Sequence, residues 1–546
     1  MKKWIHWKLV LSISIFLSIL LITNVIYRDY MSLPSENWSK YITLYQSAST
    51  EDTNNYYNDI LDATSTDDNL LITFSDKNTL NLQKLDENGN ILSSNTFEMT
   101  SPAFKLSISK NAGTIDVLVA HEYSILKYSF NESTLDFISE YEVTSSYDDV
   151  KFSDGTALYL IEDTFYFFNG TSTAIAGSNK LTEQFDYSIK DDSVYISILE
   201  YDYGYYYYAV QTYDLMQSKT SYTRIEKIST ISGTISLDID SIIHNQKLYG
   251  CIILKNTKFG QNYIDTRVLD LSNFSLLESY DATNMNYDPN MHIVVYNDQV
   301  CMAYNDKSFI GKHEIGSQFS NYTNVFLKSI DDVTPIDHTA TKILTKSQNY
   351  APNMKLILFK GHHYLFTSEI LNQANYIYLS SDIPSIIEKS LNMTFDEYKN
   401  ILFGALTYIP TSLLTIWSVI IGLIIPVAFI AIPIAIFKMN WVEHNHGKML
   451  KATLAAYLLI KIYYFYDNWN SIYLPFGDLG ATPFHLSTVP AVFATFIFTT
   501  GISFICLYLQ RKRNPETHFI TSFFSFFGFE MIQYMLYITV YLTMFK

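Results

Sequence analysis

Residues 413–437 form a stretch of 25 uncharged and almost wholly apolar positions that reads LLTIWSVIIGLIIPVAFIAIPIAIF. As a helix that rises 1.5 Å per residue, it is long enough to cross the roughly 30 Å hydrocarbon layer of a membrane. Pro426 and Pro433 break its internal hydrogen bonds, which neighbouring helices compensate for in membrane bundles. This stretch therefore predicts a membrane protein, and the other segments are interpreted around it.

A second apolar stretch, residues 9–27, follows Lys2, Lys3 and Lys8 near the amino end. It is longer than the apolar region of a cleavable signal peptide and ends without an A-x-A-like pattern, which favours an uncleaved anchor. Lysines on the amino side of a span hold that side in the cytoplasm. We therefore predict an amino-terminal transmembrane anchor in residues 1–30 and an extracytoplasmic chain after it.

Residues 31–382 alternate apolar and polar residues in short runs, which indicates an extracytoplasmic β-rich domain. Turn-forming pairs recur between these runs, at Asp154-Gly155, Asp191-Asp192, Asn245-Gln246, Asn297-Asp298 and Lys360-Gly361. Their spacing, roughly 40 to 60 residues, fits one four-stranded sheet per unit and predicts a β-propeller of about six to eight blades. Tandem β-sandwiches give the same alternation and are the alternative.

After residue 382 the pattern becomes helical. We predict interfacial amphipathic helices in residues 383–410, the first starting at Pro384 and the second at the capping box Thr394–Glu397. A four-helix transmembrane bundle is predicted in residues 411–546, with spans at about 413–437, 449–466, 489–509 and 519–545. Basic loops between the spans belong in the cytoplasm. The predicted protein thus crosses the plasma membrane five times, with a cytoplasmic amino end, and the carboxyl end and the β-domain outside.

Two charged residues stand inside these predicted spans. Lys461 lies 10 residues beyond Lys451, and Glu530 lies 12 residues beyond His518, so both reach similar depths of roughly 15 to 18 Å. An unpaired charge in lipid costs at least about 2.5 to 3.5 kcal/mol. We therefore predict an intramembrane ion pair between Lys461 and Glu530, which either fixes the register of two helices or relays a proton or substrate.

One segment of the β-domain is unusually rich in tyrosine, with Tyr201, Tyr203, Tyr205, Tyr206, Tyr207 and Tyr208. An exposed cluster of this kind can stack on sugars or bind another protein. A twisted pair of strands would instead place the tyrosines alternately in the core and in solvent. Both interpretations stay open. Cys251 and Cys301 are the one pair available for a disulfide, since Cys506 lies in an apolar segment, and two separate buried thiols are the alternative.

A net charge of −17 argues against a nucleic-acid partner, because phosphate binding needs a basic surface. The chain has no G-x-S-x-G, H-E-x-x-H, P-loop or Gly-rich dinucleotide motif. Neighbouring strand residues point to opposite faces, so His362-His363 is a poor metal site. We predict no cofactor, no metal and no catalytic residues.

These observations predict a non-enzymatic integral membrane protein of the cell envelope, whose outer β-domain binds a protein or cell-envelope ligand and whose spans lie in the lipid bilayer. One alternative is a transporter or a membrane-enzyme component with its active part in the bundle. Another is a propeller hydrolase or lyase, because propellers assemble sites from residues far apart in sequence.

Overall fold

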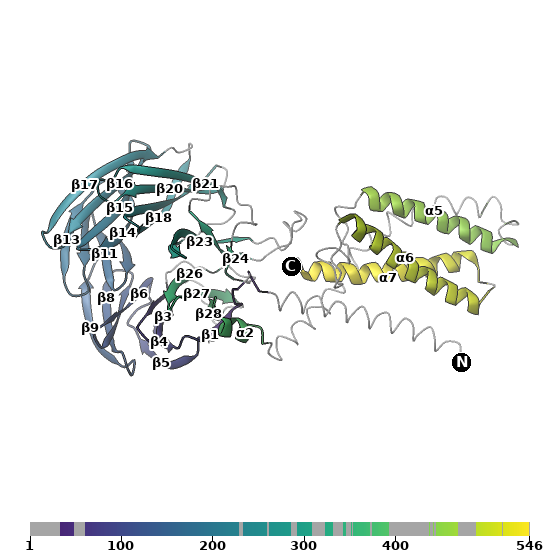
Figure 1. Ribbon diagram of the computed structural model, residues 1–546, viewed down its shortest axis with the longest axis horizontal. Coiled ribbons are helices and arrows are strands. Elements are labelled where there is room, and N and C mark those ends of the chain that lie inside the picture. The colour runs from purple at the N-terminus through teal and green to yellow at the C-terminus, as the bar shows by residue number, and fades with distance from the viewer. Residues whose placement is uncertain are drawn as a thin grey trace. The chain divides into compact units, whose positions relative to one another are not determined.

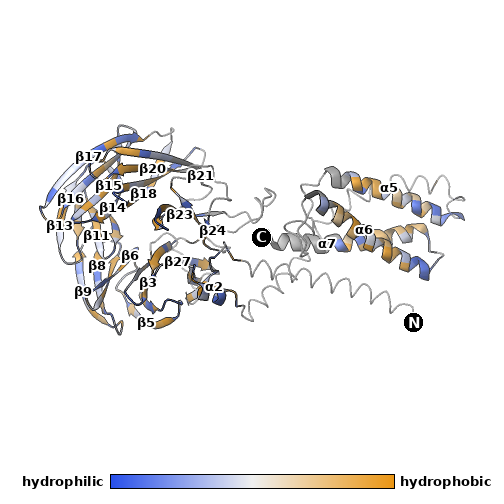
Figure 2. Ribbon diagram, viewed as in Figure 1, coloured by the Kyte–Doolittle hydropathy of each residue, from blue (hydrophilic) through white to orange (hydrophobic). Residues whose placement is uncertain are grey.

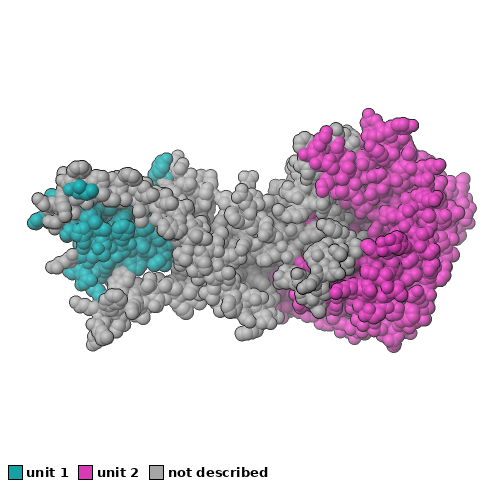
Figure 3. All heavy atoms as spheres, turned by 180° about the vertical axis from the view of Figure 1, so that it is seen from behind, with its two compact units in different colours: residues 1–32, 309–320, 393–546 teal, residues 33–308, 321–392 magenta. Residues whose placement is uncertain are grey.

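The computed structural model describes residues 33–47 except 36, 60–228, 233–258, 261–285, 292–307, 323–330, 342–345, 351–392 except 352, 372 and 373, 436, 441, 444–467, and 488–544 except 516. The chain divides into two compact units, which Figure 3 colours separately. One comprises residues 33–308 and 321–392 and contains the described strands; the other comprises residues 1–32, 309–320 and 393–546.

The described strands form seven antiparallel four-stranded sheets, which we call blades 1 to 7 (Figure 1). Blade 1 contains β2 (Leu61–Ser65), β3 (Leu70–Asp76), β4 (Thr79–Leu85) and β5 (Ile91–Glu98). Blade 2 contains β6 (Lys105–Asn111), β7 (Thr114–Ala120), β8 (Ile125–Asn131) and β9 (Phe137–Thr144). Blade 3 contains β10 (Asp149–Ser153), β11 (Thr156–Ile161), β12 (Thr164–Phe168) and β13 (Thr173–Ser178). Blade 4 contains β14 (Thr182–Lys190), β15 (Ser193–Asp202), β16 (Tyr205–Asp214) and β17 (Lys219–Ile228). Blade 5 contains β18 (Thr234–His244), β19 (Lys247–Asn256), β20 (Gln261–Asp270) and β21 (Leu276–Met285). Blade 6 contains β22 (His292–Tyr296), β23 (Gln299–Lys307), β24 (Thr323–Ser329) and β25 (Lys342–Ile343). Blade 7 contains β26 (Asn353–Phe359), β27 (His362–Leu371), β28 (Ala374–Ser381) and β1 (Ile42–Gln46).

The first strands of successive blades contact one another around a ring. Strand β2 contacts β6 and β26, β10 contacts β6 and β14, and β18 contacts β14 and β22. Blade 7 closes the ring, because its outer strand β1 precedes all the others in the chain and pairs antiparallel with β28. The domain is therefore a seven-bladed β-propeller. The predicted propeller is confirmed, and the alternative of tandem β-sandwiches is excluded for the described strands.

The recurring turn pairs join the first and second strands of blades 3 to 7. Each contains backbone in the left-handed region, for example at Asn245 (φ 46°) and Gln246 (φ 62°), and at Lys360 (φ 49°) and Gly361 (φ 82°). Two-residue hairpin turns of this handedness match the twist of the flanking strands and favour Asn, Asp and Gly. The sequence repeat therefore marks the same hairpin in five blades.

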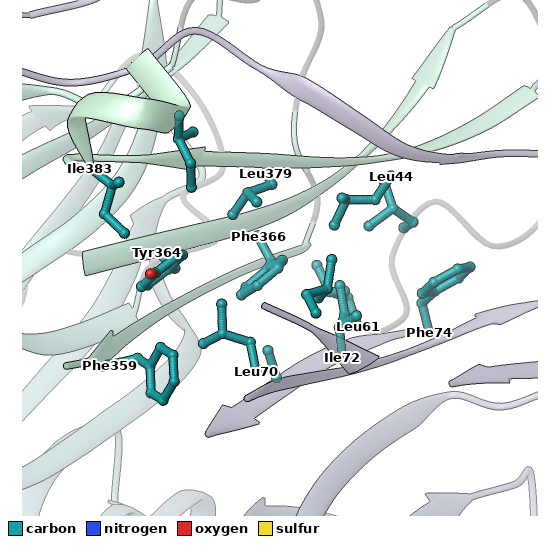
Figure 4. Packing of buried hydrophobic residues seen from close by; sticks show 14 residues of the cluster. Leu44, Leu61, Leu70, Ile72, Phe74, Phe359, Tyr364, Phe366, Leu379 and Ile383 are labelled. Carbon is teal, nitrogen blue, oxygen red and sulfur yellow. The ribbon is translucent and has the colours of Figure 1, made fainter. Parts of the chain in front are cut away.

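The core of the propeller lies between the blades. Apolar and polar residues are interspersed along the strands (Figure 2), and each pair of neighbouring blades buries one apolar cluster. The cluster between blades 7 and 1 joins the two ends of the propeller sequence, and Figure 4 shows it, with Leu44, Leu61, Leu70, Ile72, Phe74, Phe359, Tyr364, Phe366, Leu379 and Ile383 labelled. Burial of apolar area in these clusters is the main stabilising contribution.

Helix α2 (Pro384–Ser390) follows β28 directly and starts with a proline in its first turn. Ile386 is buried in the cluster between blades 7 and 1. Ser385 Oγ donates a hydrogen bond of 2.6 Å to Asn88 Oδ1, and Lys389 Nζ donates one of 3.0 Å to Asn90 Oδ1. The prediction of an interfacial helix here is wrong, because its apolar side packs against the propeller. Residues 393–410 lie outside the described part of the chain.

The second unit contains α5 (His446–Asp467), α6 (Thr488–Arg513) and α7 (Phe519–Met544). Within the described residues, no helix combines the length and apolarity that a membrane crossing requires. The predicted spans 449–466, 489–509 and 519–545 lie in these helices. The spans predicted at 9–27 and 413–437 lie outside the described residues.

This finding corrects several predictions together. The transmembrane bundle, the five-span plasma-membrane topology with an extracytoplasmic β-domain, and the lipid bilayer as a partner are not supported, and we withdraw them. The predicted functions that depend on membrane spans, an integral envelope receptor and a transporter, fall with them. The propeller remains as the basis for a functional argument.

Candidate functional site

A cavity of about 820 Å³ lies at the centre of the ring, lined by the first strand of each blade. Its titratable residues are Asp62, Lys105, Lys151, Asp154, Asp186, Asp238, Asp240, His292, Lys355 and His363. No sequence pattern identifies these residues as a group. Its members come from eight strands and the β10–β11 turn, spread over about 300 residues, and only the closed ring brings them together.

Each lysine that lines the cavity is paired with a carboxylate. The Nζ–carboxylate distances are 2.8 Å for Lys355 and Asp62, 2.6 Å for Lys151 and Asp238, and 3.3 Å for Lys105 and Asp149. Burial disfavours the charged form of Lys151, but Asp238 and Asp186 outweigh it and raise the pKa of this amine. The lysines therefore join blades to one another across the cavity.

The acidic residues of the cavity also hold neighbouring blades. Asp62 accepts a hydrogen bond of 2.9 Å from the backbone N–H of Ile108, and Asp240 accepts one of 2.8 Å from Ile293. In each case the carboxylate is on the first strand of one blade and the N–H on the first strand of the next. A carboxylate on an inner strand is the sequence signal for this link, although its partner cannot be identified without the ring.

Asp186 makes the same kind of link in a more crowded electrostatic setting. Its Oδ2 accepts hydrogen bonds from the backbone N–H of Ser241 (2.6 Å) and from Ser241 Oγ (2.8 Å). Burial and the nearby carboxylate of Asp240 raise the pKa of Asp186 to about 7, although Lys151 opposes the change. The geometry gives these side chains a role in holding the blades together.

The tyrosine-rich segment is the hairpin of β15 and β16 in blade 4. Tyr203 and Gly204 form its two-residue turn, both with positive φ (47° and 86°). Tyr206 and Tyr208 are buried, whereas Tyr201, Tyr203 and Tyr205 have exposed fractions of 48%, 95% and 46%. The segment thus divides between core and solvent, and its turn carries three exposed aromatic rings. We call Tyr201, Tyr203 and Tyr205 the tyrosine hairpin.

Other contacts hold the tyrosine hairpin in place. The rings of Tyr201 and Tyr206 are 5.1 Å apart, and the Nζ of Lys227 lies 3.0 Å from the ring centroid of Tyr205. The guanidinium carbon of Arg224 lies 4.6 Å from the ring centroid of Tyr207. The surface therefore combines aromatic rings with cationic side chains from the neighbouring strand β17.

The structure brings Lys461 and Glu530 into contact in the helical unit. The Nζ of Lys461 and Oε1 of Glu530 form an ion pair, and both side chains are fully buried. Lys461 also donates hydrogen bonds to Thr499 Oγ1 (3.0 Å) and Thr500 Oγ1 (2.7 Å), and the Tyr457 hydroxyl donates one of 2.5 Å to Glu530. This network connects α5, α6 and α7. Residue counting from the sequence gave no indication of the two threonines or the tyrosine.

The histidine pair in β27 does not diverge as its strand position suggests. The Nδ1 atoms of His362 and His363 each lie 3.1 Å from a different oxygen of Asp382. Burial opposes ionisation of Asp382, but hydrogen bonds from His363 and His362 lower its pKa below the usual value. Cys251 and Cys301 are separate buried thiols, and burial raises the pKa of Cys251.

No family model matches the chain, and no curated protein matches it. Among solved structures, Sqt1 from Saccharomyces cerevisiae is similar with 7% identity and a TM-score of 0.36, over 63% of this chain and 99% of that one. The WD40 domain of coronin from Toxoplasma gondii has 10% identity and a TM-score of 0.35, over 66% and 96%. Hsv2 from Kluyveromyces lactis has 9% identity and a TM-score of 0.34, over 59% and 98%. Similarity at this level assigns no function to the chain.

Proposed function

We propose that the propeller is a protein-binding domain whose contact surface is centred on the tyrosine hairpin. The observation that carries this proposal is the 95% exposure of Tyr203 at the turn, flanked by the exposed rings of Tyr201 and Tyr205. Tyrosine is enriched at binding hot spots because it offers a large apolar surface with a polar end and few rotatable bonds. The predicted protein partner thus becomes a proposal tied to a defined surface.

The fixed geometry of the hairpin supports the same function. The hydroxyl of Tyr206 accepts a hydrogen bond of 3.1 Å from the backbone N–H of Ser236, which anchors the hairpin to blade 5. A binding surface that is already ordered loses less conformational entropy when a partner docks. The central cavity is a weaker candidate, because its lysines are engaged in ion pairs between blades.

A photo-crosslinking amino acid at position 203 tests the proposal in the full chain inside its own cells. We expect it to capture one defined protein. The control carries the crosslinker at position 123, where Tyr123 is 69% exposed in the β7–β8 connection. Capture of the same proteins from both positions, or of none from position 203, would contradict the proposed surface.

A substitution at Tyr203 tests whether its ring is needed to bind the captured protein. Tyr203→Asn removes the ring, and asparagine tolerates the positive φ of this position, so the turn is kept. We expect the variant to lose at least tenfold in affinity for the captured protein, measured by titration with purified components. Tyr123→Asn should bind as tightly as the unchanged protein.

A further inference from the structure

Strand β17 is the outer edge of the blade that carries the tyrosine hairpin. It pairs with β16 on one side, and within the described residues no strand pairs with its other side. Its first six residues, 219–224, are all exposed. An edge strand of this kind presents unpaired backbone N–H and C=O groups to which another extended chain can add. The backbone of β17 thus provides half of a strand-pairing site.

The charge of β17 distinguishes it from the other outer strands. It contains Lys219, Arg224 and Lys227 against one carboxylate, Glu226, in a chain with a net charge of −17. The outer strands of blades 2 and 5 have the opposite character, with Glu140 and Glu142 in β9, and Glu278 and Asp281 in β21. Among the described outer strands longer than two residues, only β17 has more cationic than acidic side chains.

The two lysines of β17 are the charges available to a ligand. Arg224 is engaged with Glu200 at 2.7 Å and Asp202 at 3.3 Å. Lys219 has no carboxylate partner within the described part of the chain. Lys227 lies against the ring of Tyr205, at the end of β17 next to the tyrosine hairpin. The strand therefore has one cationic group near each end.

The pairing register limits how a ligand segment fits. Strand β17 pairs regularly with β16 from Lys219 to Arg224, and the register then shifts at the position of Ile225. Six extended residues span about 20 Å at 3.3 Å per residue. A bulge ends regular pairing, so the free edge suits a short strand whose last side chains extend toward Lys227 and Tyr205.

We propose that an extended acidic segment of a partner protein binds along β17 as a fifth strand of blade 4. Backbone hydrogen bonds to residues 219–224 give affinity, and carboxylates facing Lys219 and Lys227 select an acidic sequence. Tyr203 and Tyr205 contact the end of the segment. This inference rests on the proposed protein-binding function and specifies the chemistry of the partner.

The experiment uses the full chain and three fluorescent ten-residue peptides. One has two consecutive Glu at each end and Val between them, because Lys219 pairs with Asp214 and Lys227 with Tyr207 of β16, positions that point to opposite faces of the blade. The second has Lys in place of Glu, and the third has Pro at two central Val positions, which prevents strand pairing. Fluorescence anisotropy should show that the Glu-Val peptide binds at least tenfold tighter than the other two, and that its affinity falls as salt is added.

Charge reversal on the strand completes the test. The variant Lys219→Glu/Lys227→Glu should bind the Glu-Val peptide at least tenfold more weakly and should gain affinity for the Lys peptide, which also shows that it is folded. Glu140→Gln/Glu142→Gln, on the outer strand β9, is the matched control, because it changes the charge of another edge strand without making that strand cationic, and it should bind the Glu-Val peptide within twofold of the unchanged chain.

Several outcomes would overturn the inference: equal binding of the Glu and Lys peptides, equal binding of the proline peptide, or unchanged binding by the β17 variant. Self-association detected by light scattering and abolished by Lys219→Glu/Lys227→Glu would identify a second copy of the chain as the occupant instead. If position 203 still captures a protein while the acidic peptide does not bind, this inference fails and the proposed function stands.

Discussion

Asp186 is expected to make the stability of the propeller depend on pH. Its pKa of about 7 in the folded protein lies above the value of about 3.9 for an unperturbed aspartate, so protonation favours the folded state. This contribution is fully present below about pH 4 and is lost as the pH rises through 7. Above pH 7, the ionised carboxylate therefore destabilises the fold.

Asp186→Asn tests this dependence, since the amide oxygen can still accept a hydrogen bond from Ser241. We expect the free energy of unfolding to rise by about 2 kcal/mol at pH 8 and to change little at pH 4. A change in pKa from about 3.9 to about 7 corresponds to about 4 kcal/mol, and we expect half because the side chain is partly exposed in the cavity. Urea unfolding at both pH values measures the difference, and an equal gain at both would contradict the prediction.

Glu530→Gln is expected to destabilise the helical unit by about 3 to 5 kcal/mol, because it leaves the fully buried amine of Lys461 without a charged partner. The double variant Lys461→Met/Glu530→Leu removes both charges and should recover most of this loss. Chemical unfolding followed by helical circular dichroism measures both. If the double variant is no more stable than the single one, the ion pair does not determine the stability of these helices.

Residue counting from the sequence put Lys461 and Glu530 at similar depths because the rise of a helix is constant. It did not identify Tyr457, Thr499 or Thr500, because which faces of the helices meet depends on packing. The cavity shows the same limit. The partners Lys355 and Asp62 lie almost 300 residues apart, and only closure of the ring brings them within 2.8 Å.

Gly250 in β19 marks a close approach between blades 4 and 5. A Cβ added there would lie 2.3 Å from the hydroxyl oxygen of Tyr208, which is buried and 3.0 Å from Ser197 Oγ. We expect Gly250→Ala to reduce the free energy of unfolding by about 1 to 3 kcal/mol through overpacking. Tyr208→Leu in the same background removes the hydroxyl oxygen and the ring carbon Cζ, which would lie 2.7 Å from the added Cβ, and should restore part of the loss, measured by thermal unfolding. If the double variant regains no stability, the contact with Tyr208 is not the source of the strain.

The elements themselves were predictable where local chemistry decides. Turns such as Asn245-Gln246 and Lys360-Gly361 were visible because few residues tolerate a positive φ. The sequence does not decide between a propeller and tandem sandwiches, because both give alternating strands. The pairing that decides, β1 with β28, joins strands far apart in the chain. The membrane prediction for α5, α6 and α7 is not supported, because no described helix combines the length and apolarity that a crossing requires.

At the scale of the whole molecule, Trp38 secures the closure of the ring. Its fully buried indole donates a hydrogen bond of 3.2 Å to Ser380 Oγ, and the Lys342 amine lies 4.7 Å from its ring. We expect Trp38→Ala to cost about 3 to 5 kcal/mol and to lower the hydrogen-exchange protection of β1 and β28 more than that of β7. Trp441→Ala, at a position 44% exposed, is the control and should change neither quantity. A uniform loss of protection across the blades would contradict a local role in closure.

Because β1 and β28 lie far apart in the chain, they cannot pair until long after the ribosome has made β1. Trp38 and Ser380, which meet beside this pair, are 342 residues apart. At about 5 to 20 residues per second, the ribosome needs roughly 17 to 70 seconds to make the chain between them. Throughout that interval β1 lacks its partner strand while the other blades are synthesised, so the first of the described strands to be made is among the last to be incorporated.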